Sequence, residues 1–420
     1  MNILLLGSGA REHAIVKSLL RTGTSAADIL VAPGNAGLAT DVNCVRIDPN
    51  DPTEVTEFAL ANAIELVIIG PEAPLVAGVS DALRAAGVAV FGPSQKAAQL
   101  EGSKSFAKEI MAAADVPTGM AKECDTMTEV ESAMDAFGAP YVIKADGLAA
   151  GKGVIVTTDR VAALQHAAKF IDGGILVEEF LSGPEVSLFF LSDGTNVLPL
   201  APAQDFKRAY DNDEGPNTGG MGAYSPLPWL PEGFVEEVER TVALPTVKEL
   251  AKLGAPFVGL LYCGLILTNR GLRVIEFNAR FGDPETQVVL RRLVTPLAAL
   301  LYAAATGSLD TSATPKFSDE AAITVVLASE GYPESAAPSR PILNLEAAES
   351  VPEIEICHAA TSIAVIDGKE QLVSTGGRVL SVVAVGSDFH DARAHAYHAM
   401  EKLALEGSHY RRDIARQVAL

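Results

Sequence analysis

The first hundred residues alternate short apolar runs with stretches of helical periodicity, and this alternation limits the possible fold more than any other feature. Strands are expected at 2–6, 29–32, 66–69 and 88–91, and helices at about 10–20, 53–61 and 79–86. Strands that alternate with helices form βαβ units and pair in a parallel sheet. The sequence therefore predicts a doubly wound α/β domain over residues 1–100.

Three loops of this domain directly follow strands, at 7–13, 33–37 and 70–74. Ligands of doubly wound sheets bind at the carboxyl ends of the strands, so these loops are expected to meet at one edge. The pair Gly7 and Gly9 begins like a dinucleotide fingerprint, but the third glycine position holds Glu12. This pattern disfavours NAD or FAD. The two glycines can let loop amides approach an anion beside the next helix, or they can simply form a structural tight turn, and the pattern fits both interpretations equally well.

The character of the sequence changes after residue 100. Helices are predicted at 104–114, 160–171, 232–253 and 388–405, and short strands from Pro117 onward, at 141–144, 154–158, 175–180, 186–191, 257–268, 272–278, 322–328, 353–358, 361–366 and 379–385. Residues 205–226 are rich in Gly, Asp and Asn and are expected to form a long loop, which at this length indicates function or mobility.

These patterns predict three domains. The first is the α/β domain already described. Residues 101–312 are expected to form a central domain that carries a smaller subdomain at about 117–186. A stretch rich in Ser, Thr and Pro near 310–319 indicates a boundary, and residues 313–420 are expected to form a small β-rich domain.

Composition narrows the possible function. The chain has 32 Lys and Arg against 53 Asp and Glu, a net charge of −21, which argues against general nucleic-acid binding. No stretch reaches the roughly 18 apolar residues that a membrane span requires. The apolar start is too short for a signal peptide.

The cysteines are widely spaced along the chain, which favours a reducing cytoplasm. These cysteines are Cys44, Cys124, Cys263 and Cys357. His395 and His398 can share a helix face, but no third ligand is placed to complete a metal site.

A glycine-rich segment runs from Lys144 to Gly153 between two predicted strands. It lacks the spacing, the Ser or Thr and the following helix of a Walker A loop. A glycine-rich hairpin can fold over the phosphates of a nucleotide, and Lys144 at the strand end can neutralise them. An ordinary flexible hairpin is the alternative.

Carboxylates surround an apolar pair after the next strand. Glu178, Glu179 and Glu185 flank Phe180 and Leu181. A carboxylate at a strand end can accept hydrogen bonds from ribose hydroxyls, while strand backbone groups can read an adenine edge. On spacing alone, exposed strand carboxylates are the favoured interpretation.

Glu276, Asn278 and Arg280 alternate along one predicted strand, so they are expected to share one face. The residues expected to face the core are Ile275, Phe277 and Ala279. A carboxylate and an amide oxygen side by side are hard ligands that suit a Mg²⁺ bound to phosphates. Arg280 on the same face can stabilise a phosphoryl group in transfer. The Gly-Asp-Pro-Glu sequence at 282–285 disfavours a polar strand face without a role.

Several motifs carry a resemblance to a known family. Leu-Glu-Gly-Ser-Lys-Ser-Phe, the glycine-rich segment, Val-Glu-Glu-Phe-Leu and the Glu276 strand resemble the ATP-grasp superfamily. Gly-Ser-Gly-Ala-Arg-Glu-His, Ala-Pro-Gly-Asn-Ala-Gly, Gly-Pro-Glu-Ala-Pro-Leu, Gly-Pro-Asn-Thr-Gly-Gly-Met-Gly-Ala-Tyr-Ser-Pro and Arg-Phe-Gly-Asp-Pro-Glu-Thr-Gln resemble the phosphoribosylamine–glycine ligase family. The resemblance covers essentially the whole chain. It implies an ATP-grasp fold and ATP-dependent ligation of glycine to 5-phosphoribosylamine through glycyl phosphate, in de novo purine synthesis.

The resemblance also implies roles for individual residues. It assigns ATP binding to Lys104, Lys144, Gly151, Lys152, Gly153, Glu178, Glu179, Phe180, Leu181 and Glu185. It assigns a Mg²⁺ or Mn²⁺ to Glu276 and Asn278, and catalysis to Lys144, Arg280 and Asp283. For glycine and phosphoribosylamine the candidates are Gly9, Asn35, Gly37, Glu72, Asp205, Gly219, Gly220, Met221 and Arg378, with Arg378 at the 5-phosphate. The oligomeric state cannot be read from the sequence, and a monomer is plausible.

Two departures from the family pattern stand out. The family usually has Gln-Asp-His-Lys-Arg before the long loop, whereas this chain has Phe206 at the histidine position. An essential chemical role for that histidine would undermine the resemblance, while a packing role would tolerate Phe. The short stretch at 171–174 is expected to trim the lid subdomain and leave the site unchanged.

Two alternative functions remain open. One is an ATP-grasp ligase or carboxylase for another acid and amine, which the Gly-Pro-Asn-Thr-Gly-Gly-Met sequence disfavours. The other is a nucleotide-binding protein without catalysis. The joint presence of Lys104, Lys144, Glu276, Asn278 and Arg280 argues against it.

Overall fold

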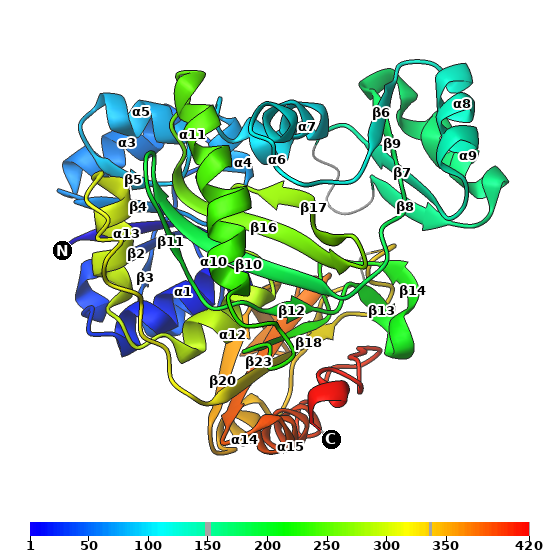
Figure 1. Ribbon diagram of the computed structural model, residues 1–420. Coiled ribbons are helices and arrows are strands. Elements are labelled where there is room, and N and C mark those ends of the chain that lie inside the picture. The colour runs from blue at the N-terminus through cyan, green and yellow to red at the C-terminus, as the bar shows by residue number, and fades with distance from the viewer. Residues whose placement is uncertain (148–152, 336–337, 420) are drawn as a thin grey trace.

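The computed structural model describes residues 1–147, 153–335 and 338–419. An N-terminal α/β layer lies beside a central antiparallel sheet, a smaller lid projects from one end, and a β-rich unit lies below (Figure 1). None of the helices in these ranges is long and apolar enough to cross a membrane. The three-part arrangement agrees with the predicted mixed α/β fold.

The N-terminal sheet is parallel, as predicted. Its five strands have the order β3-β2-β1-β4-β5. They are β1 (Ile3–Gly7), β2 (Ile29–Pro33), β3 (Asn43–Cys44), β4 (Leu66–Ile69) and β5 (Ala89–Phe91). The helices between them are α1 (Ala10–Arg21), α2 (Leu38–Asp41), α3 (Pro52–Ala61), α4 (Ala73–Val76) and α5 (Val79–Ala85). The strand order changes direction between β1 and β4. Residues of the loops that follow β1 and β2 line a cavity at the carboxyl ends of these strands.

The lid has its own sheet and core. Its strands β6 (Ala121–Cys124), β9 (Ile175–Glu178), β7 (Tyr141–Ala145) and β8 (Val154–Thr157) pair in this order, all antiparallel. Helices α8 (Met127–Phe137) and α9 (Arg160–Phe170) supply part of a separate hydrophobic core. The prediction that Pro117 begins a segment of short strands missed a helix, because α8 follows β6. Thr126 and Glu129 form a capping box at its start, a signal that the sequence already contained.

The central sheet has the strand order β11-β10-β16-β17. These strands are β11 (Val197–Pro199), β10 (Glu185–Asp193), β16 (Val258–Thr268) and β17 (Gly271–Asn278). The neighbouring helices are α6 (Gln99–Gly102), α7 (Lys104–Ala113), α10 (Phe234–Val238), α11 (Leu244–Lys252), α12 (Glu285–Arg292) and α13 (Leu297–Ala305). A π-helical turn at Glu239–Ala243 joins α10 to α11, so the predicted helix over 232–253 is nearly continuous.

The long loop expected at 205–226 is largely β structure, so that prediction is wrong. It contains β13 (Arg208–Tyr210), β14 (Glu214–Asn217) and β15 (Gly222–Ser225), and β12 (Gln204–Asp205) at its start. Its Gly, Asp and Asn residues make the turns between these strands, and they mask strands too short to show a clear alternation. β15 pairs with β18 (Ala321–Ala328), so this segment joins the central unit to the C-terminal sheet.

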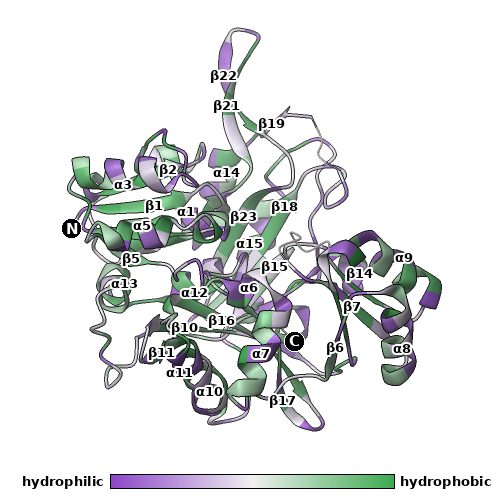
Figure 2. Ribbon diagram, turned by 90° about the horizontal axis from the view of Figure 1, so that it is seen from above, coloured by the Kyte–Doolittle hydropathy of each residue, from purple (hydrophilic) through white to green (hydrophobic). Residues whose placement is uncertain are grey.

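The C-terminal unit continues that sheet in the order β12-β15-β18-β23-β20. Its remaining elements are β20 (Ile354–His358), β23 (Arg378–Gly386), α14 (Leu345–Glu349) and α15 (Phe389–Met400). A small sheet of β19 (Arg340–Pro341), β22 (Lys369–Ser374) and β21 (Thr361–Ile366) lies beside it. The β21–β22 hairpin projects from the body of the molecule (Figure 2).

Candidate active site

Lys144 lies where the lid sheet meets the central sheet. Its ammonium is 2.9 Å from the carboxylate of Glu178 and donates a hydrogen bond to the carbonyl of Ile275 at 3.2 Å. Lys108, which the sequence analysis did not single out, lies 3.3 Å from the other oxygen of Glu178. Lys144 and Glu178 are both buried, so the lysine is held in place before any ligand binds.

A β-bulge explains why the Ile275 carbonyl is available. Gly264 pairs with Glu276 while the next residue, Leu265, pairs with Val274, which leaves Ile275 as the extra residue of β17. Ile275 is half-buried, so the prediction that it faces the core is wrong. Phe277 and Ala279 are buried, as predicted.

Glu276 and Asn278 are half-buried near the end of β17, with the carboxylate surrounded by cations. Burial raises the pKa of Glu276, but Lys207, Lys144 and Lys104 outweigh that effect and hold it below its usual value. The carboxylate therefore stays ionised. Its ionised oxygens and the Asn278 amide oxygen suit a hard divalent cation. Among the residues described, no cluster of three or more His, Cys, Asp or Glu forms a complete metal site, so phosphate and water oxygens would have to complete the coordination.

Arg280 lies two residues beyond the end of β17, so the prediction that it belongs to this strand is wrong. Its guanidinium is 2.9 Å from Glu101 and 3.7 Å from Glu72. Burial lowers the pKa of Arg280, but these carboxylates raise it above the ordinary value. Glu101 also accepts a hydrogen bond from the Ala279 backbone at 2.7 Å, which fixes the chain next to the arginine.

An acidic group adjoins this site at β12. Lys207 contacts the Glu185 carboxylate at 2.5 Å. Burial, together with Glu285 and Glu185, raises the pKa of Asp205 to about 8, against the opposing effect of Lys207. Burial therefore favours the protonated form of Asp205.

Phe206, between these two charged residues, has different neighbours. Its ring lies 6.2 Å from the Tyr224 ring, and the Arg411 guanidinium lies 4.9 Å from its centroid. Phe206 also packs against the main hydrophobic core. The position where the chain departs from the family pattern is thus a packing position in this structure.

A buried polar triad supports the central sheet under the site. The oxygens of Ser187, Tyr262 and Glu285 lie within 3.0 Å of one another. Burial raises the pKa of Tyr262 well above its ordinary value, so the phenol keeps its proton. The sequence analysis missed this group because its members come from β10, β16 and α12.

A cavity of about 440 Å³ opens between the N-terminal and C-terminal units. Its walls include Ser8, Gly9, Gly34, Asn35, Asp283, Thr375, Gly376, Gly377, Arg378 and Ser381. Of the predicted substrate residues, the structure therefore brings Gly9, Asn35 and Arg378 together with Asp283.

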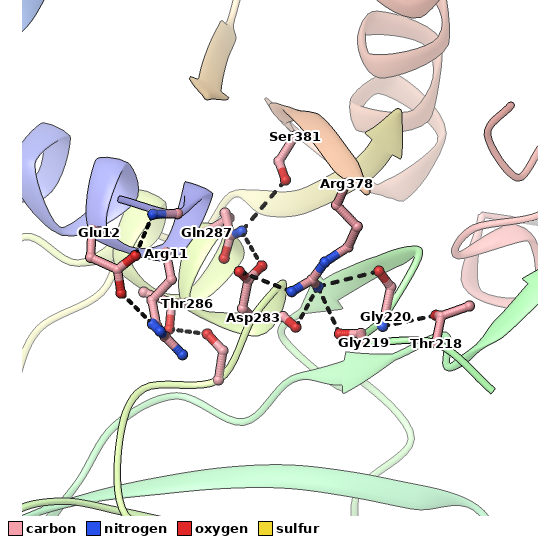
Figure 3. A network of polar contacts seen from close by, with 12 residues as sticks. Arg11, Glu12, Thr218, Gly219, Gly220, Asp283, Thr286, Gln287, Arg378 and Ser381 are labelled. Carbon is pink, nitrogen blue, oxygen red and sulfur yellow. Dashed lines mark hydrogen bonds and ion pairs between the residues drawn. The ribbon is translucent and has the colours of Figure 1, made fainter. Parts of the chain in front are cut away.

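Arg378 and Asp283 join three distant segments at this cavity (Figure 3). The guanidinium donates to the Gly219 carbonyl at 2.7 Å and to the Asp283 carbonyl at 2.8 Å, and lies 3.1 Å from the Asp283 carboxylate. Gln287 donates to the same carboxylate at 2.8 Å. Burial raises the pKa of Asp283, but Arg378 and Arg11 overcome this effect and lower it. Asp283 is therefore an anion in the cavity wall.

Glu12 fills the space under the first glycine loop. The Gly9 amide donates to its carboxylate at 2.6 Å, and a Cβ on Gly70 would lie 2.1 Å from the same side chain. The carboxylate thus occupies the amide that a dinucleotide phosphate would need at this fingerprint. This contact argues further against NAD or FAD at the loop.

The predicted substrate residues differ in where they lie relative to this cavity. Asn35 donates to the carbonyls of Ser8 and His358, both at 2.8 Å. Gly37 lies behind the cavity, where a Cβ would be 2.4 Å from the His358 ring. Glu72 lies with Arg280 instead. Gly220 lies in the turn that Arg378 contacts. Met221 is fully buried and both its backbone groups are paired, so it can support this turn but offers no free polar group.

The remaining ATP candidates lie around the lid. The Lys104 ammonium donates to the Gly147 carbonyl at 3.0 Å, and the Gly153 carbonyl accepts from the Ala145 amide at 2.7 Å. Gly151 and Lys152 lie outside the described residues. Glu179 accepts from the Met120 amide at 3.0 Å and pairs with Arg270 at 2.7 Å. Phe180 is exposed, and Leu181 packs over Gly119.

Comparisons with known proteins agree with this architecture. Residues 1–101, 102–286 and 322–417 match the N domain, the ATP-grasp (A) domain and the C domain of phosphoribosylglycinamide synthetase. A protein of Leifsonia xyli named phosphoribosylamine–glycine ligase is 63% identical over 419 residues, which cover 99% of each chain. A protein of the same name from Streptomyces coelicolor is 56% identical over the full length of both chains.

Solved structures give the same result. The crystal structure of phosphoribosylamine–glycine ligase from Thermotoga maritima superimposes with a TM-score of 0.83 at 32% identity, over 98% of this chain and 100% of that one. The biotin carboxylase domain of a Hydrogenobacter thermophilus 2-oxoglutarate carboxylase, solved with MgADP, has a TM-score of 0.70 at 18% identity and shares the fold. It covers 97% of this chain and 91% of its own. With three family domains in order along the chain, and full-length relatives at this identity, the chain belongs to the phosphoribosylglycinamide synthetase family.

Proposed function

We propose that the protein joins glycine to 5-phospho-D-ribosylamine with ATP, giving glycinamide ribonucleotide, ADP and phosphate. This is the second step of de novo purine synthesis, and it proceeds through glycyl phosphate. One observation carries the proposal beyond family membership. The segment from Glu276 to Asp283, eight residues long, connects the cation-rich site under the lid to the wall of the cavity between the N-terminal and C-terminal units. The ATP site and the acceptor site of a ligase must lie close together, and this short segment is consistent with that need.

ATP is assigned to the junction of the lid and the central sheet. Lys104 and Lys144 neutralise its phosphates, and residues 151–153 of the glycine-rich segment are assigned to the same phosphates. Glu178 and the backbone of residues 179–181 contact adenine, and Glu185 binds the ribose. Glu178 is already balanced by Lys144 and Lys108, so ATP enters a site whose charges are fixed. This preorganisation is what phosphoryl transfer chiefly requires.

A Mg²⁺, or in its place a Mn²⁺, is assigned to Glu276 and Asn278. When bound, the ion neutralises charge on the phosphate oxygens. The protein itself keeps Glu276 ionised through the three neighbouring lysines. Arg280, held by Glu101 and Glu72, adds fixed positive charge beside the group in transfer.

The chemistry divides into two displacements. A carboxylate oxygen of glycine attacks the γ-phosphorus, the bond to the bridging oxygen breaks, and ADP leaves. The amine of phosphoribosylamine then attacks the carbonyl carbon of glycyl phosphate, and the C–O bond to phosphate breaks. The amine loses one proton in this step. The ionised carboxylate of Asp283 is assigned to accept it, because it lies in the wall of the acceptor cavity.

Phosphoribosylamine is assigned to that cavity. Gly9 and Asn35 form its N-terminal wall, and Arg378 supplies positive charge for the 5-phosphate. Gly37, behind this wall, and Glu72, beside Arg280, remain predicted substrate residues. The boundary toward glycine is assigned to Gly219, Gly220, Met221 and Asp205. A cytoplasmic monomer, and domain divisions at residues 100 and 312 with a lid at about 117–186, remain predictions.

Phosphate release tests the proposal. The assay contains ATP, Mg²⁺ and glycine, with and without phosphoribosylamine formed in the cuvette from ribose 5-phosphate and ammonia. We expect release only with both substrates, and loss of release when alanine or serine replaces glycine. Release with a different acid or amine would retain the fold and overturn the substrates. If the protein binds ATP but releases no phosphate with any pair of acid and amine, it is a nucleotide-binding protein without catalysis. Parallel assays with Mn²⁺ decide the metal preference.

A further inference from the structure

One carboxylate connects the base of the glycine-rich segment to the helix that carries Lys104. Asp146 directly follows β7, and its Oδ1 accepts hydrogen bonds from the backbone amides of Lys104 at 2.5 Å and Gly147 at 3.0 Å. Its Oδ2 accepts from the hydroxyls of Ser105 at 2.5 Å and Ser103 at 3.2 Å. Asp146 thus ties the end of a lid strand to the first turn of α7.

This connection exceeds what α7 needs for its own stability. The helix already has a cap from its own chain, because the Ser103 hydroxyl accepts from the Phe106 amide. Asp146, by contrast, follows a strand of the lid sheet and lies 42 residues beyond Lys104 along the chain. A carboxylate at a helix N-terminus interacts favourably with the helix dipole, so the contact is strong as well as specific.

The same turn also fixes the far end of Lys104. Its ammonium donates to the carbonyl of Gly147, the residue after Asp146, at 3.0 Å. The lysine is therefore held at its backbone by the Asp146 carboxylate and at its charged end by the next carbonyl. A lysine ammonium has three donors, so two remain for phosphate oxygens.

We propose that Asp146 is a positioning residue for ATP. It holds the Lys104 ammonium and the first residues of the glycine-rich segment in one fixed relation, so that the nucleotide phosphates meet a preorganised cation. The inference rests on the proposed function, because that function assigns Lys104 to the phosphates. Asp146 itself need not touch the nucleotide.

Asp159 supplies a matched control in the same lid. It caps α9 by accepting from the amides of Val161 at 2.8 Å and Ala162 at 3.2 Å. It is thus also an aspartate at a helix N-terminus, but it has no contact with Lys104. Its removal deletes a helix cap and reports that structural effect alone.

The experiment measures MgADP binding by calorimetry, melting temperature, and KM for ATP and for glycine. It compares Asp146→Ala, Asp146→Asn and Asp159→Ala with the unmodified chain. We expect Asp146→Ala to raise the Kd of MgADP and the KM of ATP about tenfold, with the KM of glycine within twofold. Asp146→Asn keeps an acceptor oxygen for the Lys104 amide, so its Kd for MgADP should lie between those of the unmodified chain and Asp146→Ala. Asp159→Ala should lower the melting temperature and leave the Kd unchanged.

A double-mutant cycle with Lys104→Ala tests whether Asp146 acts through the lysine. In the Lys104→Ala background, Asp146→Ala should change the Kd of MgADP less than threefold. A change below threefold in the otherwise unmodified chain, an equal change in Asp159→Ala, or an undiminished tenfold change in the Lys104→Ala background would each overturn the proposal. If Asp146→Ala does not fold, Asp146→Asn decides by the same threefold limit.

The binding readout separates this inference from the proposed function. MgADP binding without glycine-dependent turnover would refute the ligase assignment. The Kd values of the variants would still decide the role of Asp146 in that case. Absence of MgADP binding in the unmodified chain would refute both.

Discussion

At the scale of single residues, the site depends on charges that the protein balances before ligands arrive. Lys144 is held between the Glu178 carboxylate and the Ile275 carbonyl, and Arg280 between two carboxylates. A charge held in this way needs little reorganisation when phosphate charge develops nearby. This arrangement supports the proposed catalytic roles of Lys144 and Arg280.

Substitution of Lys144 tests the phosphate assignment. Lys144→Ala removes the cation but leaves Lys108 to pair with Glu178, so the fold should persist. We expect kcat to fall at least a hundredfold, about 3 kcal/mol in the barrier, in a phosphate-release assay. Glu276→Ala should give a loss of similar size through the metal site. Lys122→Ala removes an exposed lysine of the same lid and should leave kcat unchanged. Unchanged release in Lys144→Ala would refute the assignment.

Phe206 permits a test of the departure from the family pattern. Its ring contacts Tyr224 and Arg411, whereas the neighbouring Lys207 contacts Glu185. We therefore expect Phe206→His to change kcat less than threefold, and Lys207→Ala to lower it more than tenfold. A gain of tenfold or more in Phe206→His would mean that this position has a chemical role.

At the scale of elements, sequence periodicity predicted the long and regular pieces. Several strands were expected close to their observed bounds because their apolar patterns are extended, namely β1, β2, β4, β5, β16 and β17. The two-residue β3 was not predicted, and α15 ends at Met400 although the helix was expected to reach residue 405. Short strands between β12 and β15 were missed because turn residues dominate that stretch. The β17 bulge was also missed, since it depends on the register with β16.

The same distinction holds for the site. Glu276, Asn278, Lys144 and Asp283 belong to continuous motifs and could be proposed from the sequence. Their partners could not, because tertiary packing brings them together from separate elements. Among them are Lys207, whose charge helps to keep Glu276 ionised, and Lys108, which shares Glu178 with Lys144.

Arg378 at the start of β23 tests how one element completes the acceptor cavity. Its guanidinium holds the Gly219 carbonyl and the Asp283 carboxylate and also lines the cavity. We expect Arg378→Ala to raise the KM for phosphoribosylamine at least tenfold and to leave the Kd of MgADP within twofold. Arg340→Ala offers a control, since Arg340 pairs with Glu330 away from the cavity. A changed MgADP affinity with an unaltered KM for phosphoribosylamine would contradict the assignment.

At the scale of the whole molecule, the acceptor cavity exists only because the N-terminal and C-terminal units meet. The contact behind it is a buried pair of histidines. The His358 amide donates to Nδ1 of His13 at 2.8 Å, and the other ring nitrogen of His13 lies 3.0 Å from Asp41. Burial lowers the pKa of both imidazoles and so favours their neutral forms in the folded state.

This pair predicts a loss of stability in mild acid. Burial, aided by His13 and Lys17, lowers the pKa of His358 to about 3 from an ordinary value of 6.5. Below pH 6.5 the unfolded chain therefore binds a proton that the folded chain does not, so the free energy of unfolding falls as the pH falls toward 3. Between pH 7 and pH 5 this group alone should cost about 2 kcal/mol.

Denaturant titrations at the two pH values measure this effect. His358→Gln should reduce the difference between pH 7 and pH 5 by about 2 kcal/mol, whereas the exposed His390→Gln should leave it unchanged. An equal pH dependence in the unmodified chain and in His358→Gln would show that His358 is not the group responsible.

The fate of the glycine oxygens tests the central claim most directly. The chain is given glycine labelled with ¹⁸O in both carboxylate oxygens, together with ATP, Mg²⁺ and phosphoribosylamine, and the released phosphate is analysed by mass spectrometry. If glycyl phosphate forms and the amine displaces phosphate from carbon, each phosphate carries one ¹⁸O from glycine, and glycinamide ribonucleotide keeps the other. Phosphate without ¹⁸O, released while glycine stays unligated, would mean that the chain hydrolyses ATP and is not this ligase.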